Sequence, residues 1–270
     1  MEEKMKQVLY KWLEIDLVNI AKKMGLSNKS CDVNLELLMD TIRCLDYESI
    51  VVKKPSVNYI ITVIGLMWEH VDHTKGIGNI SKKYNIPVYA NKKTWEAMPQ
   101  VNEKVSIENH KIFSTGESFS ISDLNIFPFQ TPHDAADPCG FNIFADGKKI
   151  SIATDLGNMN ASVFNCLKNS NCILLESNYD PNVLQCSHYP YYLKQRISSS
   201  TGHLSNSLAG KTISKLIDSG LERALLIHLS KENNFPELAK QTVLDEIKTD
   251  KNFPIYVAPR DKPSDFFEVS

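Results

Sequence analysis

The chain has 270 residues, of which 42% are hydrophobic, and its 30 basic and 32 acidic residues leave a formal net charge of −2. This composition is typical of a globular protein with a full core, and it excludes a disordered chain, a fibrous chain and a nucleic-acid binder held by net charge alone. No apolar run approaches the ~18 residues of a membrane-spanning helix, and the charged N-terminus does not resemble a secretory signal. We therefore expect a cytoplasmic protein without a membrane anchor.

The first part of the chain is predicted to be a mainly helical segment, residues 1–57. Apolar residues recur at every fourth position from Leu9 to Ala21, which favours a helix. A second helix is expected over residues 33–45, with Asp32 as its N-cap.

From residue 58 onward strands dominate at first and then alternate with helices. Strands are expected over residues 59–68, 86–90, 111–113, 118–121, 125–130, 140–144, 149–153, 172–176 and 223–228. Helices are expected before residue 84 and over residues 94–98, 162–167, 191–197, 205–219 and 236–248. This order favours a layered, mixed α/β domain over residues 58–270, and the absence of linkers and repeats favours one domain overall.

Histidine and aspartate side chains gather just after apolar runs. Four motifs stand there: Glu69-His70-Val71-Asp72-His73, Thr131-Pro-His133, Ala153-Thr-Asp155 and Leu225-Leu-Ile-His228. Imidazole and carboxylate are the usual ligands of zinc, manganese and iron, so four such motifs at strand ends predict a metal site. Each motif alone is also explained by a structural histidine or a turn aspartate. The six cysteines have no C-x-x-C pair, and we expect Cys166 and Cys172 to be core thiols.

The motifs resemble the metallo-β-lactamase fold, and most closely its YycJ/WalJ-type branch of bacterial 5′-to-3′ DNA exonucleases. The resemblance covers roughly residues 58–262. It rests on the following segments: His73-Thr-Lys-Gly-Ile-Gly78, Tyr84–Ala90, Thr131–Asp137, Leu175-Glu-Ser-Asn178, Gly202-His-Leu-Ser-Asn206 and His228–Pro236. It implies an αββα four-layer sandwich that binds two divalent metal ions and hydrolyses phosphodiesters of DNA by a metal-bound hydroxide.

The resemblance also implies the ligands of each metal. One metal takes His70, His133 and Asp155, and the other takes Asp72, His73, Asp155 and His228. Asp72 would orient the attacking water and accept its proton.

Two departures from the family pattern separate this chain from its relatives. Trp68 stands where the family has the first histidine of its H-x-H motif, and the indole nitrogen of tryptophan cannot bind a metal. The first metal site is therefore expected to be weakened. The Ser/Gly-rich loop and the strand ending in D-A-G, with which the family usually opens, are missing from residues 1–57.

Several residues have two interpretations. His203 is either a phosphate-contacting, proton-donating group or a helix-cap histidine. Glu232 either holds a ligand histidine in its tautomer or is a solvated loop residue, whereas His110 and His188 are expected to be surface or loop residues. The segment between His73 and Ile112 contains seven lysines and three acidic residues. The lysines form either a patch for a nucleic-acid backbone or a solvated face.

Three functions follow. The first is a metal-dependent exonuclease acting on DNA. The second is a catalytically impaired member, because of Trp68, that acts as a binding module. The third is a hydrolase of small esters or thioesters, because the fold does not dictate the substrate.

Overall fold

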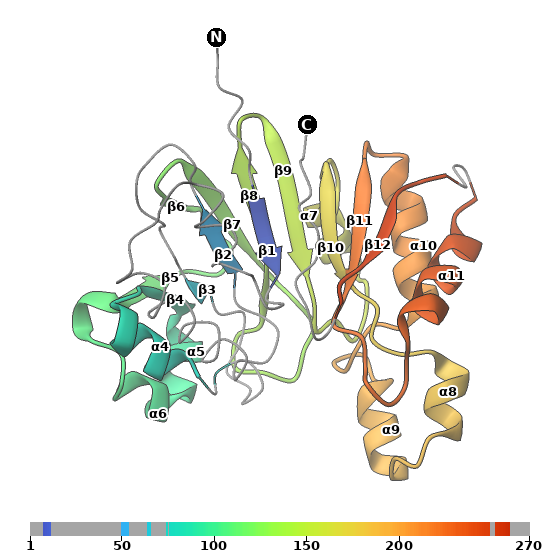
Figure 1. Cartoon of the computed structure of the whole chain (residues 1–270), viewed down its shortest axis with the longest axis horizontal. Coiled ribbons are helices and arrows are strands. Elements are labelled where there is room, and N and C mark those ends of the chain that lie inside the picture. The colour runs from blue at the N-terminus through green and yellow to red at the C-terminus, as the bar shows by residue number, and fades with distance from the viewer. Residues whose placement is uncertain are drawn as a thin grey trace, which may run out of the picture. The chain divides into compact units, whose positions relative to one another are not determined.

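The computed structural model describes residues 8–11, 50–53, 64–65, 74, 76–248 and 252–259. These residues belong to two compact units, one with its elements before Ser114 and one from Ser114 to Ala258 (Figure 1). Within the described residues, no helix is both long and apolar enough to cross a membrane.

The first unit contains a small parallel sheet. Its strands lie in the order β3-β4-β5. Their bounds are Ile64–Gly65 for β3, Val88–Asn91 for β4 and His110–Phe113 for β5. Its helices are α4 (Ile77–Tyr84), α5 (Lys92–Ala97), α6 (Pro99–Asn102) and the 3-10 turn η1 (Ile107–Asn109). His110, expected to be a surface or loop residue, is the half-buried first residue of β5 and stacks on Trp95, with 4.2 Å between ring centroids.

The helix predicted through Leu9 is wrong at residues 8–11. Val8–Lys11 form strand β1, which pairs antiparallel with β2 (Ile50–Lys53). Val, Leu and Tyr at positions 8–10 fit a strand as well as a helix, and a partner strand some forty residues away cannot be read from local periodicity. The helix expected over residues 33–45 lies outside the described residues.

The second unit is built on a mixed sheet in the order β12-β11-β10-β9-β8-β7-β6. Strands β6 to β9 form an antiparallel meander, and β9 to β12 run parallel. The meander strands are β6 (Phe119–Ile121), β7 (Leu124–Gln130), β8 (Cys139–Ala145) and β9 (Lys148–Ala153). The other parallel strands are β10 (Cys172–Glu176), β11 (Arg223–Ile227) and β12 (Ile255–Val257).

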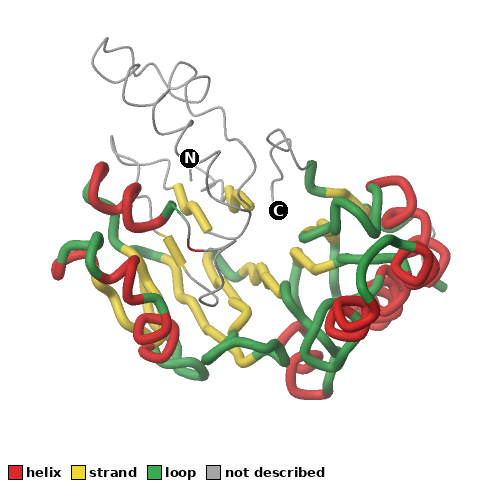
Figure 2. Tube along the Cα trace, turned by 90° about the horizontal axis from the view of Figure 1, so that it is seen from below, coloured by secondary structure: helices red, strands yellow, loops and turns green. Residues whose placement is uncertain are grey.

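Helices accompany the parallel strands, as crossover connections require (Figure 2). They are α7 (Ala161–Leu167), α8 (Pro181–Cys186), α9 (Tyr191–Ile197), α10 (Asn206–Ile217) and α11 (Pro236–Glu246). Helices α10 and α11 contact each other and bury Ile213 and Val243 in the same core as Ile173 and Leu226 of the sheet. This packing fixes the ends of β10 and β11, where the polar residues begin.

The predicted order of strands and helices is confirmed from β4 to α11, with small shifts at the element ends. The sequence analysis did not predict the short helices α6 and α8 or the strand β12. Helix α8 has a readable start, because Asp180 accepts hydrogen bonds from the N–H groups of Asn182 and Val183 and Pro181 follows it.

Candidate active site

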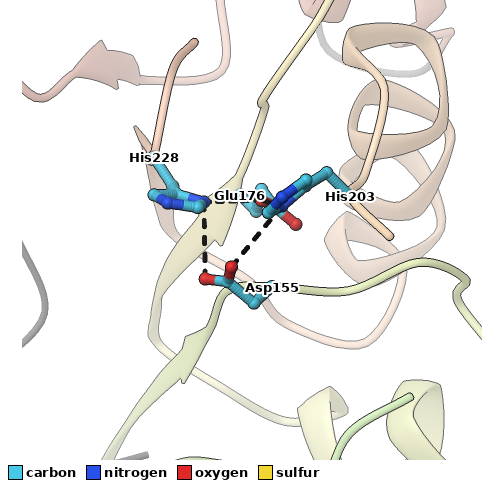
Figure 3. A group of neighbouring side chains, drawn as sticks. All are labelled: Asp155, Glu176, His203 and His228. Carbon is cyan, nitrogen blue, oxygen red and sulfur yellow. Dashed lines mark hydrogen bonds and ion pairs between the residues drawn. The ribbon is translucent and has the colours of Figure 1, made fainter. Parts of the chain in front are cut away.

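Polar side chains converge at the carboxyl edge of the second unit's sheet. Asp155 lies two residues after β9, Glu176 ends β10 and His228 directly follows β11. These strands are parallel and in register, with Leu175 opposite both Ala153 and Leu226. The register therefore brings three loops that are distant in sequence to one place (Figure 3).

Glu176 is the centre of this cluster and is fully buried. Its Oε1 accepts hydrogen bonds from Nδ1 of His203 at 2.8 Å and from Nδ1 of His228 at 2.6 Å. Its Oε2 accepts the backbone N–H groups of Leu156 at 2.8 Å and Leu204 at 3.0 Å. One carboxylate thus ties the loops after β9 and β11 to the loop before α10.

These hydrogen bonds fix which nitrogen of each imidazole carries a hydrogen. Because carboxylate oxygens only accept, Nδ1 of His203 and Nδ1 of His228 are both donors. Nε2 of His228 is then the atom whose lone pair remains for a ligand, the usual arrangement of a histidine that binds a metal.

Burial works against the charge of Glu176, but the charges and hydrogen bonds of His203 and His228 outweigh it and hold the pKa of this carboxyl far below its ordinary value. Burial likewise disfavours the charged form of His203, and the carboxylates of Glu176 and Asp155 reverse the effect, so its pKa is raised. The two histidines therefore favour the ionised form of the buried carboxylate at the centre of the cluster.

Asp155 lies between the histidines and is 2% exposed. Its Oδ1 is 3.5 Å from both Nε2 of His133 and Nδ1 of His203, and its Oδ2 is 3.4 Å from Nδ1 of His228. The hydroxyl of Thr154 donates to Oδ2 at 3.0 Å. Each carboxylate oxygen of Asp155 thus faces imidazole nitrogen.

His133 comes from the loop after β7. It is 7% exposed, and its Nδ1 donates to the carbonyl oxygen of Gly202 at 3.1 Å, so Nε2 is the acceptor nitrogen that faces Asp155. The next residue, Asp134, accepts a hydrogen bond of 2.7 Å from Nε of Arg196. The loop after β7 is therefore attached both to the His203 loop and to helix α9.

Two backbone features hold these loops in unusual conformations. Asp155 and His228 have positive φ values of 51° and 57°, a region that costs a non-glycine residue about 1–3 kcal/mol. Gly202 has no room for a side chain, because a Cβ there would lie 2.1 Å from the carbonyl oxygen of Arg196. Such local strain persists where surrounding contacts enforce it, and it is concentrated at functional sites.

An amide network, made of hydrogen bonds of asparagine side chains, connects the loops that carry the site. Asn178 donates to the carbonyl oxygen of His228 at 2.8 Å. Asn234 donates to the carbonyl oxygens of Ser177 and Asn178 at 2.8 and 3.0 Å, and it accepts from Asn206 at 3.0 Å. Asn206 and Asn234 are buried, so these contacts satisfy backbone groups that have no access to water.

Four of the predicted site residues, His133, Asp155, His203 and His228, lie together in this cluster. The other predicted residues, His70, Asp72 and His73, together with Trp68, lie outside the described residues. His203 is not a helix cap, because Ser205 is the N-cap of α10. Glu232 is exposed, as is His188.

Glu176 was not predicted from the sequence. It holds the imidazoles of His203 and His228 in one tautomer, which is the role that was suggested for Glu232. A signal was present, because a charged residue that directly follows the apolar run Ile173-Leu174-Leu175 is unusual in a buried strand.

The donor set fits a divalent metal ion. Asp155, Glu176, His203 and His228 each place an oxygen or nitrogen atom within 4.8 Å of the others. Because Glu176 accepts from both histidines, Asp155 and the remaining imidazole nitrogens are the groups left to bind an ion. Carboxylate oxygen and neutral imidazole nitrogen are the donors that zinc, manganese and iron share.

Residues 54–229 match the family model of the β-lactamase superfamily domain. The chain belongs to the β-lactamase superfamily. Exodeoxyribonuclease YycJ of Bacillus anthracis is 35% identical over 185 residues, which are 68% of this chain and 70% of the relative. Exodeoxyribonuclease WalJ of Streptococcus pneumoniae is 35% identical over 181 residues, 66% of this chain and 67% of the relative. The resemblance to the YycJ/WalJ branch is thus confirmed, and the chain is a hydrolase of this superfamily.

Solved structures agree on the fold. Zn(2+)-bound PqqB of Methylobacterium extorquens has a TM-score of 0.56 at 16% identity, covering 77% of this chain and 76% of that one. The metallo-β-lactamase fold protein YhfI of Bacillus subtilis has a TM-score of 0.54 at 15% identity, covering 75% and 76%. The mixed α/β, metallo-β-lactamase-like fold class expected from the sequence is confirmed.

Proposed function

We propose that this hydrolase is a divalent-metal-dependent 5′-to-3′ DNA exonuclease. The observation that carries the proposal is the cluster of Asp155, His133 and His228 at the carboxyl edge of the sheet, in which the buried Glu176 orients His228. Its substrate class is taken from relatives at 35% identity that are named exodeoxyribonucleases. We also propose a cytoplasmic location, as expected from the sequence.

Two metal sites are assigned to these residues. His70, His133 and Asp155 would hold one ion, and Asp72, His73, Asp155 and His228 the other. The geometry supports the roles of Asp155 and His228, because Asp155 faces imidazoles on both its oxygens and Nδ1 of His228 is occupied by Glu176. Divalent ions in such sites supply Lewis acidity, which lowers the pKa of a water and stabilises negative charge on phosphoryl oxygens.

The chain's own side chains hold and move protons. Glu176 binds Nδ1 of His203, so Nε2 is the atom from which His203 would give a proton to the leaving oxygen. Asp72 is assigned to orient the attacking water and to accept its proton. The buried carboxylate of Glu176 keeps both imidazoles in place without itself contacting the substrate.

The experiment measures metal per chain by mass spectrometry and degradation of 5′-labelled duplex DNA by the purified full-length protein. The variants are Asp155→Asn, His228→Asn and Trp68→His, with Asp146→Asn and His188→Asn as matched controls at exposed positions. We expect bound metal and digestion in the unaltered chain, loss of both in Asp155→Asn and His228→Asn, and no change in the controls.

Two results would contradict the proposal. Absence of digestion by the unaltered chain together with rescue by Trp68→His would mean a protein that keeps the fold and has become a binding module. Hydrolysis of small esters or thioesters without degradation of DNA would mean the third function considered from the sequence.

A further inference from the structure

Helix α9, whose C-terminal end contacts the loop that carries His203, begins with two strongly exposed tyrosines. Tyr191 is 75% exposed and Tyr192 is 73% exposed, although aromatic side chains usually contribute to cores and interfaces. Figure 1 shows α8 and α9 beyond the end of the parallel strands at which the active-site residues stand. The helix that carries these exposed rings therefore lies beyond the end of the sheet where the site is.

Contacts at the end of α9 connect it to the site. The N–H of His203 donates to the carbonyl oxygen of Ile197 at 2.8 Å, so the helix ends directly at the loop that carries His203. Arg196 is bonded to Asp134 at 2.7 Å, and Oδ1 of Asp134 is 3.4 Å from Nε2 of His133. The helix is thus bonded to the backbone of His203 and to the side chain of Asp134, which lies next to His133.

Tyr192 lies on the face of α9 that leads to these contacts. Residues four apart in a helix lie on one face, about 6 Å apart along the axis, so Tyr192 precedes Arg196 by one turn. Tyr192 is thus followed on this face by Arg196, which is bonded to Asp134. Asp134 in turn lies next to His133.

Helix α9 is also held in place, and it carries basic side chains near the tyrosines. Nζ of Lys194 donates to the carbonyl oxygen of Gln185 at 2.6 Å, which joins α9 to the end of α8. Residues 181–203 include Lys194 and Arg196 and contain no aspartate or glutamate, although Asp180 precedes them and Arg196 is paired with Asp134. Exposed aromatic rings beside basic side chains are the combination by which proteins bind single-stranded nucleic acid, because bases stack on the rings while the cations attract the phosphates.

We infer that Tyr191 and Tyr192 form a stacking platform for unpaired bases of a DNA strand whose end lies in the active site. The inference rests on the proposed exonuclease function and adds to it how the strand is held beyond the scissile bond. A rigid ring has few rotamers to lose, so stacking positions the strand at small entropic cost.

The test compares Tyr192→Ala and the Tyr191→Ala/Tyr192→Ala pair with Tyr192→Trp. Tyr256→Ala on β12 is the matched control, because that tyrosine is 40% exposed and lies on another element. Binding of a short single-stranded oligonucleotide is measured by fluorescence anisotropy in the presence of a chelator. Degradation of the same oligonucleotide gives KM and kcat, and hydrolysis of bis(4-nitrophenyl) phosphate reports the chemistry without a strand.

We expect the Kd and KM for the oligonucleotide to rise about tenfold in Tyr192→Ala and further in the pair, with Tyr192→Trp near the unaltered value. Hydrolysis of bis(4-nitrophenyl) phosphate and the Tyr256→Ala control should stay unchanged. An unaltered Kd in the pair would overturn the inference while the exonuclease function stands. If binding to a blunt duplex, which offers no unpaired bases, is weakened in the variants as much as binding to the single strand, this result would also overturn the inference. So would variants in which the protein loses self-association but keeps its affinity for DNA.

The exonuclease proposal fails by a different result, the absence of DNA degradation by the unaltered chain. The inference about the tyrosines is separately supported or overturned by the anisotropy measurement, which requires no turnover.

Discussion

Glu176 and His228 are joined by a hydrogen bond of 2.6 Å between Oε1 and Nδ1, although 52 residues separate them in the chain. The same oxygen accepts Nδ1 of His203. One buried carboxylate therefore sets the orientation of two imidazoles, and both lose it together when the carboxylate is removed.

The first prediction concerns this carboxylate. In Glu176→Gln the amide cannot accept from both histidines with the strength of a charged oxygen, so the imidazoles are free to change tautomer. We expect metal affinity and kcat for DNA to fall roughly 10- to 100-fold, measured by competition with a chelator and by the degradation assay. Glu232→Gln is the control, because Glu232 is exposed. Equal activity of the two variants would show that Glu176 does not position the histidines.

The second prediction concerns the amide network. Asn234→Ala removes the donor to the carbonyl oxygens of Ser177 and Asn178. The carbonyl of Asn178 keeps the N–H of Ser230, whereas the buried carbonyl of Ser177 loses its amide donor. Each buried polar group left unsatisfied costs about 1–3 kcal/mol, so we expect the free energy of unfolding to fall by at least that amount. Urea denaturation measures it, with Asn182→Ala at an exposed position as the reference. A change below about 0.5 kcal/mol would mean that the network is not important for stability.

The third prediction concerns the close packing at Gly202. A methyl group there would overlap backbone carbonyls of Arg196 and Ile197, which cannot move without shifting α9. We expect Gly202→Ala to lower kcat strongly and to reduce the melting temperature, since the displaced loop carries His203. Ser200→Ala, two residues earlier and exposed, should behave as the unaltered protein. A larger effect of Ser200→Ala than of Gly202→Ala on kcat and melting temperature would exclude packing as the reason for a glycine at this position.

The fourth prediction concerns the cysteines of the described residues. Burial raises the pKa of Cys172 to about 12 and raises the pKa of Cys139 as well, whereas Cys186 is exposed. A raised pKa leaves little thiolate at neutral pH, and the thiolate is the species that reacts. Alkylation of the native protein followed by peptide mapping should therefore label Cys186 rapidly and Cys139 and Cys172 only after unfolding. Rapid labelling of Cys139 would show that β8 opens in the native state.

The sequence predicted the second unit well because its signals are local. Apolar runs that end in Asp155 or His228 identify both the strand and the residue that follows it, and the parallel register then brings them together. Strand β12 was missed because three residues carry no usable periodicity. Strand β1 was misassigned because its conformation depends on pairing with β2, a contact that local spacing does not contain.

The role of Glu176 could not be predicted from spacing. Its position at the end of an apolar strand is readable, but its partners come from the loops before α10 and after β11. Glu232 was nearer to His228 in sequence and therefore looked like the better partner, although it is exposed. Distance along the chain is a poor guide where parallel strands bring together segments many residues apart.

Strand β9 belongs to both halves of the sheet, since it pairs antiparallel with β8 and parallel with β10. The antiparallel half consists of hairpins between neighbours in sequence, which close quickly, whereas the parallel half must bring together strands separated by helices. We therefore expect the antiparallel pairing of β9 with β8 to form before its parallel pairing with β10. During synthesis of the chain, Asp155 would be in position before Glu176 and His228, so the site is completed only when the C-terminal strands have docked.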